Sequence, residues 1–141
     1  MNKIILFLIP FLFTVVPGPV LGQVSEPRVY HFNLADVPAA HPFEGITSQR
    51  VFSDTVYMPF ITIAKGASSR HHNHPDDQTM IILSGRVNAL VGDDEYILEK
   101  EDILIIPSYV PHRVEALEDS RWIEVHGPGY MQREFDPDSW K

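Results

Sequence analysis

The chain has 141 residues, a formal net charge of −8 at neutral pH and no cysteine. This length fits one domain with a hydrophobic core, and the lack of cysteine excludes disulfides, thiolate metal ligands and a cysteine nucleophile. The acidic balance, with no cluster of basic residues, argues against nucleic acid or an anionic membrane surface as a partner.

The first 22 residues have the features of an export signal. Lys3 supplies a positive charge, Ile4 to Val16 form an apolar run, and small residues near Gly22 suit cleavage. The apolar run has 13 residues, fewer than the roughly 20 that a membrane-spanning helix needs. We therefore predict a signal peptide over 1–22 and an exported protein, periplasmic or secreted, that begins at Gln23.

Residues 23–47 are predicted to form an extended N-terminal arm. The segment is rich in proline and lacks sustained periodicity, apart from Val29 to Phe32, where one short strand could form. Such an arm is a candidate for exchange between two copies of the chain, or for lying across a partner.

Residues 48–128 contain short runs of β-branched and aromatic residues, bounded by glycine, proline, aspartate or serine. The runs are 50–53, 55–64, 79–83, 86–91, 96–98, 103–106, 112–116 and 121–126. Short strands at this spacing predict a single all-β domain, an antiparallel sandwich or barrel. Residues 129–141 remain as a C-terminal tail that is predicted to cover a barrel mouth or an interface.

Two predicted turns define the limits of some of these strands. Gly92 to Glu95 predicts a hairpin turn between two of the runs. Pro107 and Pro111 mark a loop, because proline cannot donate to a central ladder, and His112 is therefore expected to open a strand.

Three of the seven histidines fall within residues 71–74, in the stretch HHNHPDDQ. In an extended chain His72 and His74 project from one face, and neutral imidazoles at this spacing can chelate one divalent metal ion. His112 is the best placed third ligand. The alternatives are an exposed polar turn, or a site that has lost its metal.

This pattern resembles the two motifs of the cupin family. The first motif is Gly, five residues, His-x-His, three or four residues, Glu, six residues, Gly. It is matched in every spacing by Gly66, His72, His74, Gln78 and Gly85. The second motif is Gly, five residues, Pro-x-Gly, two residues, His, three residues, Asn. Its positions hold Glu101, Pro107, Tyr109, His112 and Ala116, so that both glycines and the asparagine are replaced.

The resemblance implies a single cupin jelly-roll barrel of short antiparallel strands. It also implies one divalent transition metal held by His72, His74, Gln78 and His112, with Zn, Mn, Fe, Ni and Co all compatible. Most metal cupins have glutamate where this chain has Gln78. Its amide oxygen can coordinate an ion but cannot act as a carboxylate base. The ion would keep its full +2 charge and favour binding an anionic substrate as a Lewis acid.

The run 121–126 holds the candidate catalytic residues. Trp122, Glu124 and His126 share one face, and Glu124 or His126 could transfer the proton that Gln78 cannot. The alternative is that this face points to solvent or to a subunit contact. Tyr57, Ile61, Met80, Ile82 and Trp122 are predicted to line the pocket or to belong to the core.

The form His-x-His-Pro-x-x-Gln resembles the small cupins that open the rings of unsaturated uronates from pectin and alginate. In those proteins an aspartate, a phenylalanine and an arginine follow the last ligand. Here Glu124 and His126 stand at the first two positions, Tyr130 stands at the arginine position, and Arg133 comes three residues later. The resemblance to these proteins therefore predicts the metal site of this chain but does not predict its substrate.

The leading hypothesis is an exported metal cupin that acts as an isomerase or lyase on a small oxygen-rich carboxylate or sugar acid. A second hypothesis is a metal-dependent dioxygenase of an aromatic or polyphenol. A third is a non-catalytic module that binds a small molecule or sugar. The expected partners are a small-molecule substrate and, because cupins commonly pair, a second copy in a homodimer, with no membrane partner after cleavage of the signal.

Overall fold

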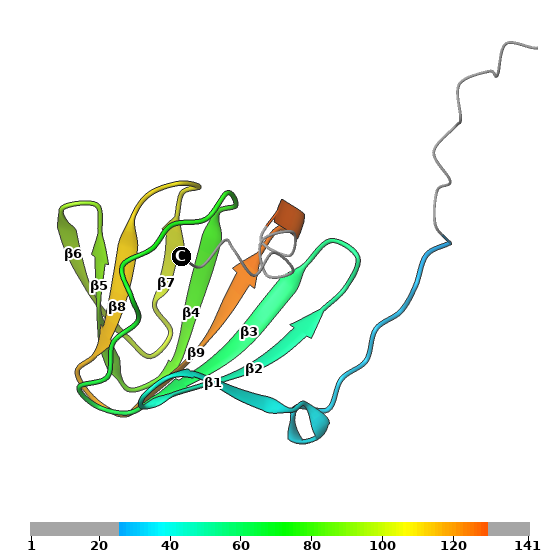
Figure 1. Cartoon of the computed structure of the whole chain (residues 1–141), viewed down its shortest axis with the longest axis horizontal. Helices are drawn as coiled ribbons and strands as arrows, with labels where there is room; N and C mark the ends of the chain where they lie inside the picture. The colour runs from blue at the N-terminus through cyan, green and yellow to red at the C-terminus, as the bar shows by residue number, and fades with distance from the viewer. Residues whose placement is uncertain (1–25, 130–141) are drawn as a thin grey trace, which may run out of the picture.

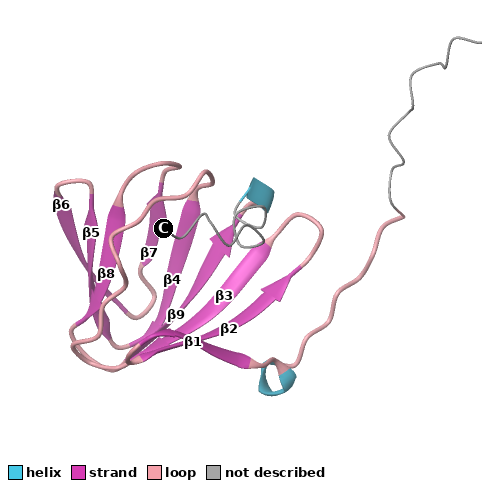
Figure 2. Cartoon of the chain, viewed as in Figure 1, coloured by secondary structure: helices cyan, strands magenta, loops and turns pink. Residues whose placement is uncertain are grey.

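The structure is a computed structural model that describes residues 26–129, and it contains two antiparallel β-sheets that face each other (Figures 1 and 2). A single 3-10 turn, η1 (Leu34–Asp36), precedes the strands. The strands are β1 (Ala39–Phe43), β2 (Ile46–Phe52), β3 (Tyr57–Ile63), β4 (Gln78–Ser84), β5 (Arg86–Val91), β6 (Asp94–Glu99), β7 (Ile103–Ile106), β8 (His112–Ala116) and β9 (Ser120–His126).

The larger sheet has the strand order β1-β2-β3-β9-β4-β7, and the smaller has the order β6-β5-β8. Each sheet therefore combines strands that are far apart in sequence, as a jelly roll requires. Figure 1 shows the smaller sheet at the left and the larger sheet curving from β7 to β2 at the right. The predicted all-β architecture of short antiparallel strands is confirmed.

The hydrophobic core lies between the sheets and follows from alternation along the strands. In β3, Tyr57, Pro59, Ile61 and Ile63 are buried, whereas the residues between them are partly or fully exposed. The same alternation in β4 buries Met80 and Ile82, which are at most 1% exposed. Because side chains in a strand alternate between faces, each strand contributes one apolar row to the interior.

The β5–β6 hairpin forms where the sequence predicted it. Val91 pairs with Asp94, so that only Gly92 and Asp93 form the turn, and the strand begins two residues earlier than expected. His112 opens β8 as predicted.

The N-terminal region differs from the sequence prediction. Residues 29–32 form no strand, and they are held to the body by the Tyr30 hydroxyl, which donates to Asp54 Oδ1 at 2.7 Å. A strand forms instead at β1, and β2 begins at Ile46, so both fall partly or wholly inside the segment 23–47 that was expected to be an arm. Pro42 is tolerated in β1 because this strand is at the edge of its sheet.

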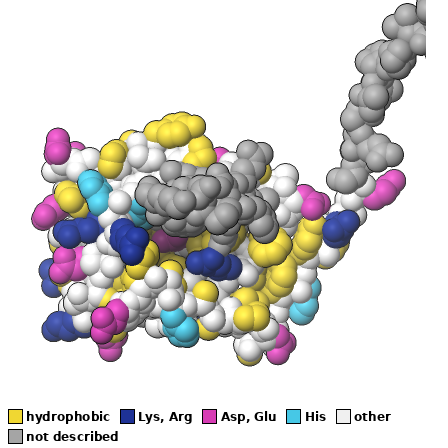
Figure 3. Space-filling view, in the orientation of Figure 1, with side chains coloured by type: hydrophobic (Ala, Val, Ile, Leu, Met, Phe, Trp, Pro, Cys, Tyr) yellow, Lys and Arg dark blue, Asp and Glu magenta, His cyan; other side chains and the backbone are white. Residues whose placement is uncertain are grey.

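None of the helices within residues 26–129 is long and apolar enough to cross a membrane. On the face drawn in Figure 3, Lys and Arg side chains lie among acidic ones. The predicted signal peptide and most of the C-terminal tail, including Tyr130 and Arg133, lie outside the described residues.

Candidate metal centre

One loop and two strand starts bring the predicted ligands together. Gln78 begins β4 and His112 begins β8. His72 pairs with His112 through an isolated antiparallel bridge, in which each backbone N–H donates to the other residue's carbonyl at 3.0 and 2.8 Å. A bend at Pro75 and Asp76 then returns the chain to β4, so that His74 lies next to Gln78.

The three histidines converge. Their ligand atoms lie within 4.8 Å of one another. The ring centroid of His112 is 4.4 Å from that of His72 and 5.0 Å from that of His74. His74 and His112 are each 1% exposed and Gln78 is 2% exposed, so these side chains are enclosed by the barrel.

Each histidine presents the same ring nitrogen to the centre. In every ring Nδ1 lies within hydrogen-bond distance of a backbone carbonyl oxygen, which can only accept, so Nδ1 carries the proton and Nε2 is left with a lone pair. The pairs are His72 with Arg70 at 2.8 Å, His74 with Asp76 at 2.7 Å and His112 with Val110 at 2.8 Å.

The position of Gln78 completes the donor set. Its Oε1 lies 2.8 Å from Nε2 of His74 and 3.1 Å from Nε2 of His112. With the proton on Nδ1, the lone pairs of Nε2 and Oε1 face each other without a hydrogen between them. A cation bound by all of these atoms would replace this repulsion with coordination. Two ligands about 2.1 Å from one ion and at right angles are about 3.0 Å apart, so the spacing fits a first-row divalent metal.

Burial favours the neutral form of His74 and His112. It lowers the pKa of His74, and it lowers the pKa of His112 to about 4, against an ordinary value of 6.5. Nearby histidines add to both shifts. Because only a neutral imidazole binds a metal, the site is ready for an ion at neutral pH.

The face of β9 that holds the candidate catalytic residues points inward. Trp122 is 3% and His126 2% exposed, which overturns the alternative that this face meets solvent. Trp122 Nε1 donates to Glu124 Oε1 at 2.8 Å, and His126 Nε2 lies 3.2 Å from Glu124 Oε2. The ring of His126 is 5.0 Å from that of His74, so the group adjoins the candidate metal ligands.

Two neighbouring side chains favour the ionised form of Glu124. Burial raises its pKa, but the interactions with His126 and the hydrogen bond from Trp122 outweigh burial and leave the pKa below its ordinary value. Its side chain is 16% exposed. The group is therefore ionised at neutral pH, oriented through both oxygens, and able to accept a proton.

The predicted pocket residues fall into two groups. Tyr57 is opposite His126, with ring centroids 5.6 Å apart, at the level of the metal ligands. Met80 is opposite Glu124, one level further in. Ile61, Ile82 and Trp122 lie deeper, and these three residues belong to the hydrophobic core together with Met80. They therefore support the site by packing.

Arg50 is an inward-facing residue that the sequence did not single out. It follows the buried Ser48 on the same face of β2, and its Nε donates to Ser48 Oγ at 3.2 Å. Arg50 pairs with Pro59, and Pro59 lies between Tyr57 and Ile61, which pair with His126 and Trp122. The alternation of Ile46, Ser48 and Arg50 along one strand would have predicted that Arg50 faces inward. It was missed because this strand was predicted to start at residue 50.

Two substituted motif positions keep the conformation of glycine. Glu101 and Tyr109 have φ values of 77° and 62°, in the left-handed region that favours glycine. The backbone N–H of Tyr109 donates to His74 O at 2.7 Å, so this conformation helps to hold the loop that carries His72 and His74. The backbone at these two positions therefore keeps the conformation that the motif glycines would adopt, although the residues themselves differ from the motif.

A groove of about 480 Å³ lies at the other end of the larger sheet, where β1, β2 and β3 border it. Its lining includes His41, Phe43 and Ile63 but none of the predicted site residues. This groove is separate from the metal centre.

Comparison with known proteins agrees with this architecture. Residues 59–126 match the cupin domain family. KdgF from Halomonas sp. superimposes with a TM-score of 0.67 at 21% identity, covering 72% of this chain and 94% of that chain. An RmlC-like cupin from Shewanella frigidimarina gives 0.66 at 20% identity, covering 71% and 92%.

Salicylate 1,2-dioxygenase from Pseudoaminobacter salicylatoxidans gives a TM-score of 0.62 at 17% identity, covering 68% of this chain but only 31% of that longer chain. No curated protein matches the sequence. The strand order, the domain match and the histidine cluster together lead to one assignment: residues 59–126 form a cupin domain.

Proposed function

We propose that the protein is a metal-dependent enzyme of the isomerase or lyase type that acts on a small carboxylate or sugar acid. The observation that carries the proposal is the convergence of three Nε2 atoms and Gln78 Oε1 beside an ionised, partly buried Glu124. His72, His74, Gln78 and His112 would hold one divalent transition metal.

When bound, the ion would supply a Lewis acid that polarises a carbonyl or hydroxyl oxygen of the substrate. Glu124 would take a proton from the neighbouring carbon and return it elsewhere on the substrate. The hydrogen bonds from Trp122 and His126 hold both carboxylate oxygens, so the base is oriented before substrate arrives.

Charge supports an anionic substrate. The four ligand groups are neutral, so they leave the ion with its full positive charge, and burial disfavours protonation of His74 and His112. A carboxylate-bearing substrate would offset this charge in an enclosed site. The resemblance of the ligand motif to uronate ring-opening cupins, together with the similarity in fold to KdgF, favours sugar acids within this class.

A second candidate is a metal-dependent dioxygenase of an aromatic compound. It is favoured by the fold shared with salicylate 1,2-dioxygenase and by a three-histidine set that suits iron as well as other divalent metals. We also propose that the protein is exported, because Lys3 and the following apolar run have the pattern of a signal peptide.

Metal content tests the ligand set first. Elemental analysis of the purified protein should find about one transition metal ion per chain, since the site has one donor set. His72→Ala and His112→Ala should lose the ion. His71→Ala is the matched control, because His71 is exposed and adjoins the same loop, and it should keep the ion. An empty protein after loading with several divalent ions would refute the metal centre.

Turnover then tests the reaction class. We expect conversion of an unsaturated uronate without oxygen uptake, and loss of at least about 100-fold in kcat in Glu124→Gln with metal content unchanged. Glu115→Gln is the control, because Glu115 lies on β8 with its carboxylate 3.9 Å from exposed Arg113. Oxygen consumption with an aromatic substrate would favour the dioxygenase. Substrate binding without turnover, unaffected by Glu124→Gln, would favour the binding module.

A further inference from the structure

Arg50 differs from the other basic residues that the structure describes. Within residues 26–129 it is the one lysine or arginine that is partly buried, whereas the others are exposed. It also faces the interior, because it pairs with the buried Pro59 on β3. Moving a guanidinium out of water costs free energy unless a negative group offsets the charge. A cation on the inner face of the barrel therefore suits the binding of an anion there.

Strand register places Arg50 in the same row as Glu124. The antiparallel register of β3 with β9 is the same before and after Pro59, and it places Pro59 opposite Glu124. Arg50, Pro59 and Glu124 therefore form one inward-facing row across β2, β3 and β9, and Met80 on β4 continues it. Proline has no polar atom in its side chain, so the residue between the cation and the carboxylate is apolar.

The larger sheet also places Glu124 between Arg50 and the candidate metal ligands. Its strand order includes β2-β3-β9-β4, with Arg50 on β2, Glu124 on β9 and Gln78 at the start of β4. Strands β2 and β4 are three strand spacings apart, about 14 Å. The side chains of Arg50 and Gln78 both extend into this span. A small molecule inside the barrel could thus meet a metal ion at one end, Glu124 in the middle and Arg50 at the other end.

The contacts of both charged groups suit this arrangement. Trp122 and His126 hold the two carboxylate oxygens of Glu124. Arg50 donates from Nε to the hydroxyl oxygen of Ser48, which is 2% exposed, and this bond orients the guanidinium. The bond uses Nε and not the two terminal amino groups. Those two groups form the fork that binds a carboxylate through parallel hydrogen bonds.

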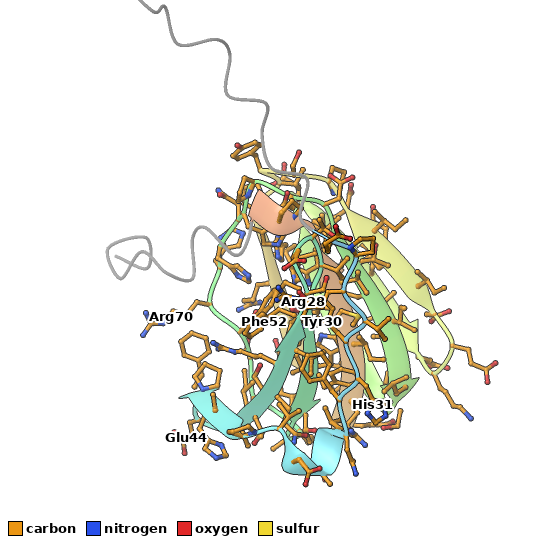
Figure 4. The ribbon with its side chains drawn as sticks, turned by 90° about the vertical axis from the view of Figure 1, so that its right-hand side faces the viewer. Arg28, Tyr30, His31, Glu44, Phe52 and Arg70 are labelled. Atoms are coloured by element: carbon orange, nitrogen blue, oxygen red, sulfur yellow. The ribbon has the colours of Figure 1, made fainter. Side chains whose placement is uncertain are left out.

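The inner face of β2 meets solvent just beyond Arg50. Phe52 is the next residue on this face and pairs with Tyr57. Phe52 is 54% exposed, whereas Tyr57 is 3% exposed. Figure 4 shows Phe52 on the same side of the molecule as Tyr30, whose hydroxyl donates to Asp54. This end of β2 therefore gives a ligand access to the guanidinium from solvent.

We infer that Arg50 binds the carboxylate of the substrate and selects acids over neutral sugars. The inference rests on the proposed function, because it takes the metal and Glu124 as the other two contacts of the same molecule. A hydroxyl or carbonyl oxygen of the substrate would face the metal, and the carbon that carries the mobile proton would lie at Glu124. The substrate would then carry its carboxylate at the end that meets Arg50.

Calorimetric titration with galacturonate and with galactose tests this role, because only galacturonate has a carboxylate. The metal-loaded protein should bind galacturonate more tightly than galactose. Arg50→Gln should weaken galacturonate binding by at least about 100-fold, since a charge-assisted bidentate pair is lost, and should change galactose binding by less than about threefold. Arg50→Lys keeps the charge but not the fork, so it should weaken galacturonate binding by about tenfold.

Arg121→Gln is the matched control. Arg121 precedes the inward-facing Trp122 on β9 and is exposed on the opposite face of the same sheet. This variant should bind both sugars as the wild-type protein does, and metal content and circular dichroism should be unchanged in all three variants. Equal weakening of both sugars in Arg50→Gln would indicate a structural role and overturn the inference. Unchanged galacturonate binding in that variant, or no galacturonate binding by the wild-type protein, would also overturn it.

Turnover separates this inference from the proposed function. With an unsaturated uronate, Arg50→Gln should raise KM by at least about 100-fold and lower kcat by less than about tenfold, because the carboxylate is bound equally in the ground state and the transition state. Turnover that does not depend on Arg50 would overturn the inference and leave the proposed function standing. Galacturonate binding that depends on Arg50, without turnover of any uronate, would support the inference and contradict the proposed reaction.

Discussion

Trp122 and Glu124, two residues apart on β9, are joined by a hydrogen bond of 2.8 Å from the indole Nε1 to Oε1. The bond runs along the inner face of the barrel and leads from the hydrophobic core to the metal centre. A residue of the core thereby orients a carboxylate of the site, and it lowers the pKa of that carboxyl group.

Trp122→Phe should therefore raise the pKa of Glu124. Loss of the donor removes one of the interactions that lower this pKa, so the acidic limb of the kcat/KM profile should move to higher pH. The free energy of unfolding should fall by about 1–3 kcal/mol, because a buried acceptor loses its partner. Metal content should stay at the wild-type level. An unshifted profile with reduced stability would mean that Trp122 has only a structural role.

The metal-free protein should lose stability as the pH is lowered from about 6.5. Histidine in the unfolded chain titrates near 6.5, whereas burial lowers the pKa of His112 to about 4 and also lowers that of His74. Between these values the unfolded state binds more protons, so each such group removes up to about 1.4 kcal/mol per pH unit.

Urea unfolding of the chelator-treated protein between pH 7 and 5 measures this slope. His112→Gln should have a smaller slope, because one buried histidine is gone, and the exposed His71→Ala should keep the wild-type slope. If the free energy of unfolding of the wild-type protein did not change between pH 7 and 5, the lowered pKa values of His74 and His112 would be contradicted.

Gly85→Ala should be strongly destabilising. Gly85 has φ +80°, and a Cβ there would overlap Ser120 Oγ and the carbonyl oxygen of Asp119. The backbone penalty of about 1–2 kcal/mol then adds to a packing penalty of about 1–3 kcal/mol. Gly92→Ala is the control, because Gly92 has φ +60° with no atom near its Cβ position, and only the backbone penalty should appear. Equal losses in thermal or urea unfolding would refute the steric argument.

Glu101→Gly and Tyr109→Gly should each stabilise the protein by up to about 1 kcal/mol. Glycine removes the strain of a left-handed backbone conformation, which costs other residues about 1–2 kcal/mol. It also increases the conformational entropy of the unfolded chain, which destabilises the folded state by about 0.5–1 kcal/mol. The Lys100–Glu101 ion pair is exposed at 3.8 Å, so its loss should matter little. A lower midpoint in urea for either variant would show that the side chain has a stabilising contact.

Sequence alone predicted the strand pattern from β3 onward, because that pattern depends on local rules. It also predicted the candidate ligands, where the resemblance to the two cupin motifs added Gln78 to the three histidines. A period of two distinguishes the faces of a strand, and a fixed spacing brings His72, His74 and Gln78 onto one loop and one strand start. The hairpin at Gly92 and the strand start at His112 follow from turn and proline chemistry in the same way.

Only the tertiary structure decided which strand faces point inward and which strands are neighbours. Alternation gives Trp122, Glu124 and His126 a common face, but packing of β9 between β3 and β4 decides that this face is the inner one. β1, which lacks an alternating pattern, exists because the edge of β2 offers hydrogen bonds to it. The same sheet order makes Phe60, Ile81, Ile103 and Ile123 neighbours, although they are scattered in sequence, because strand pairing is a long-range contact that no local pattern encodes.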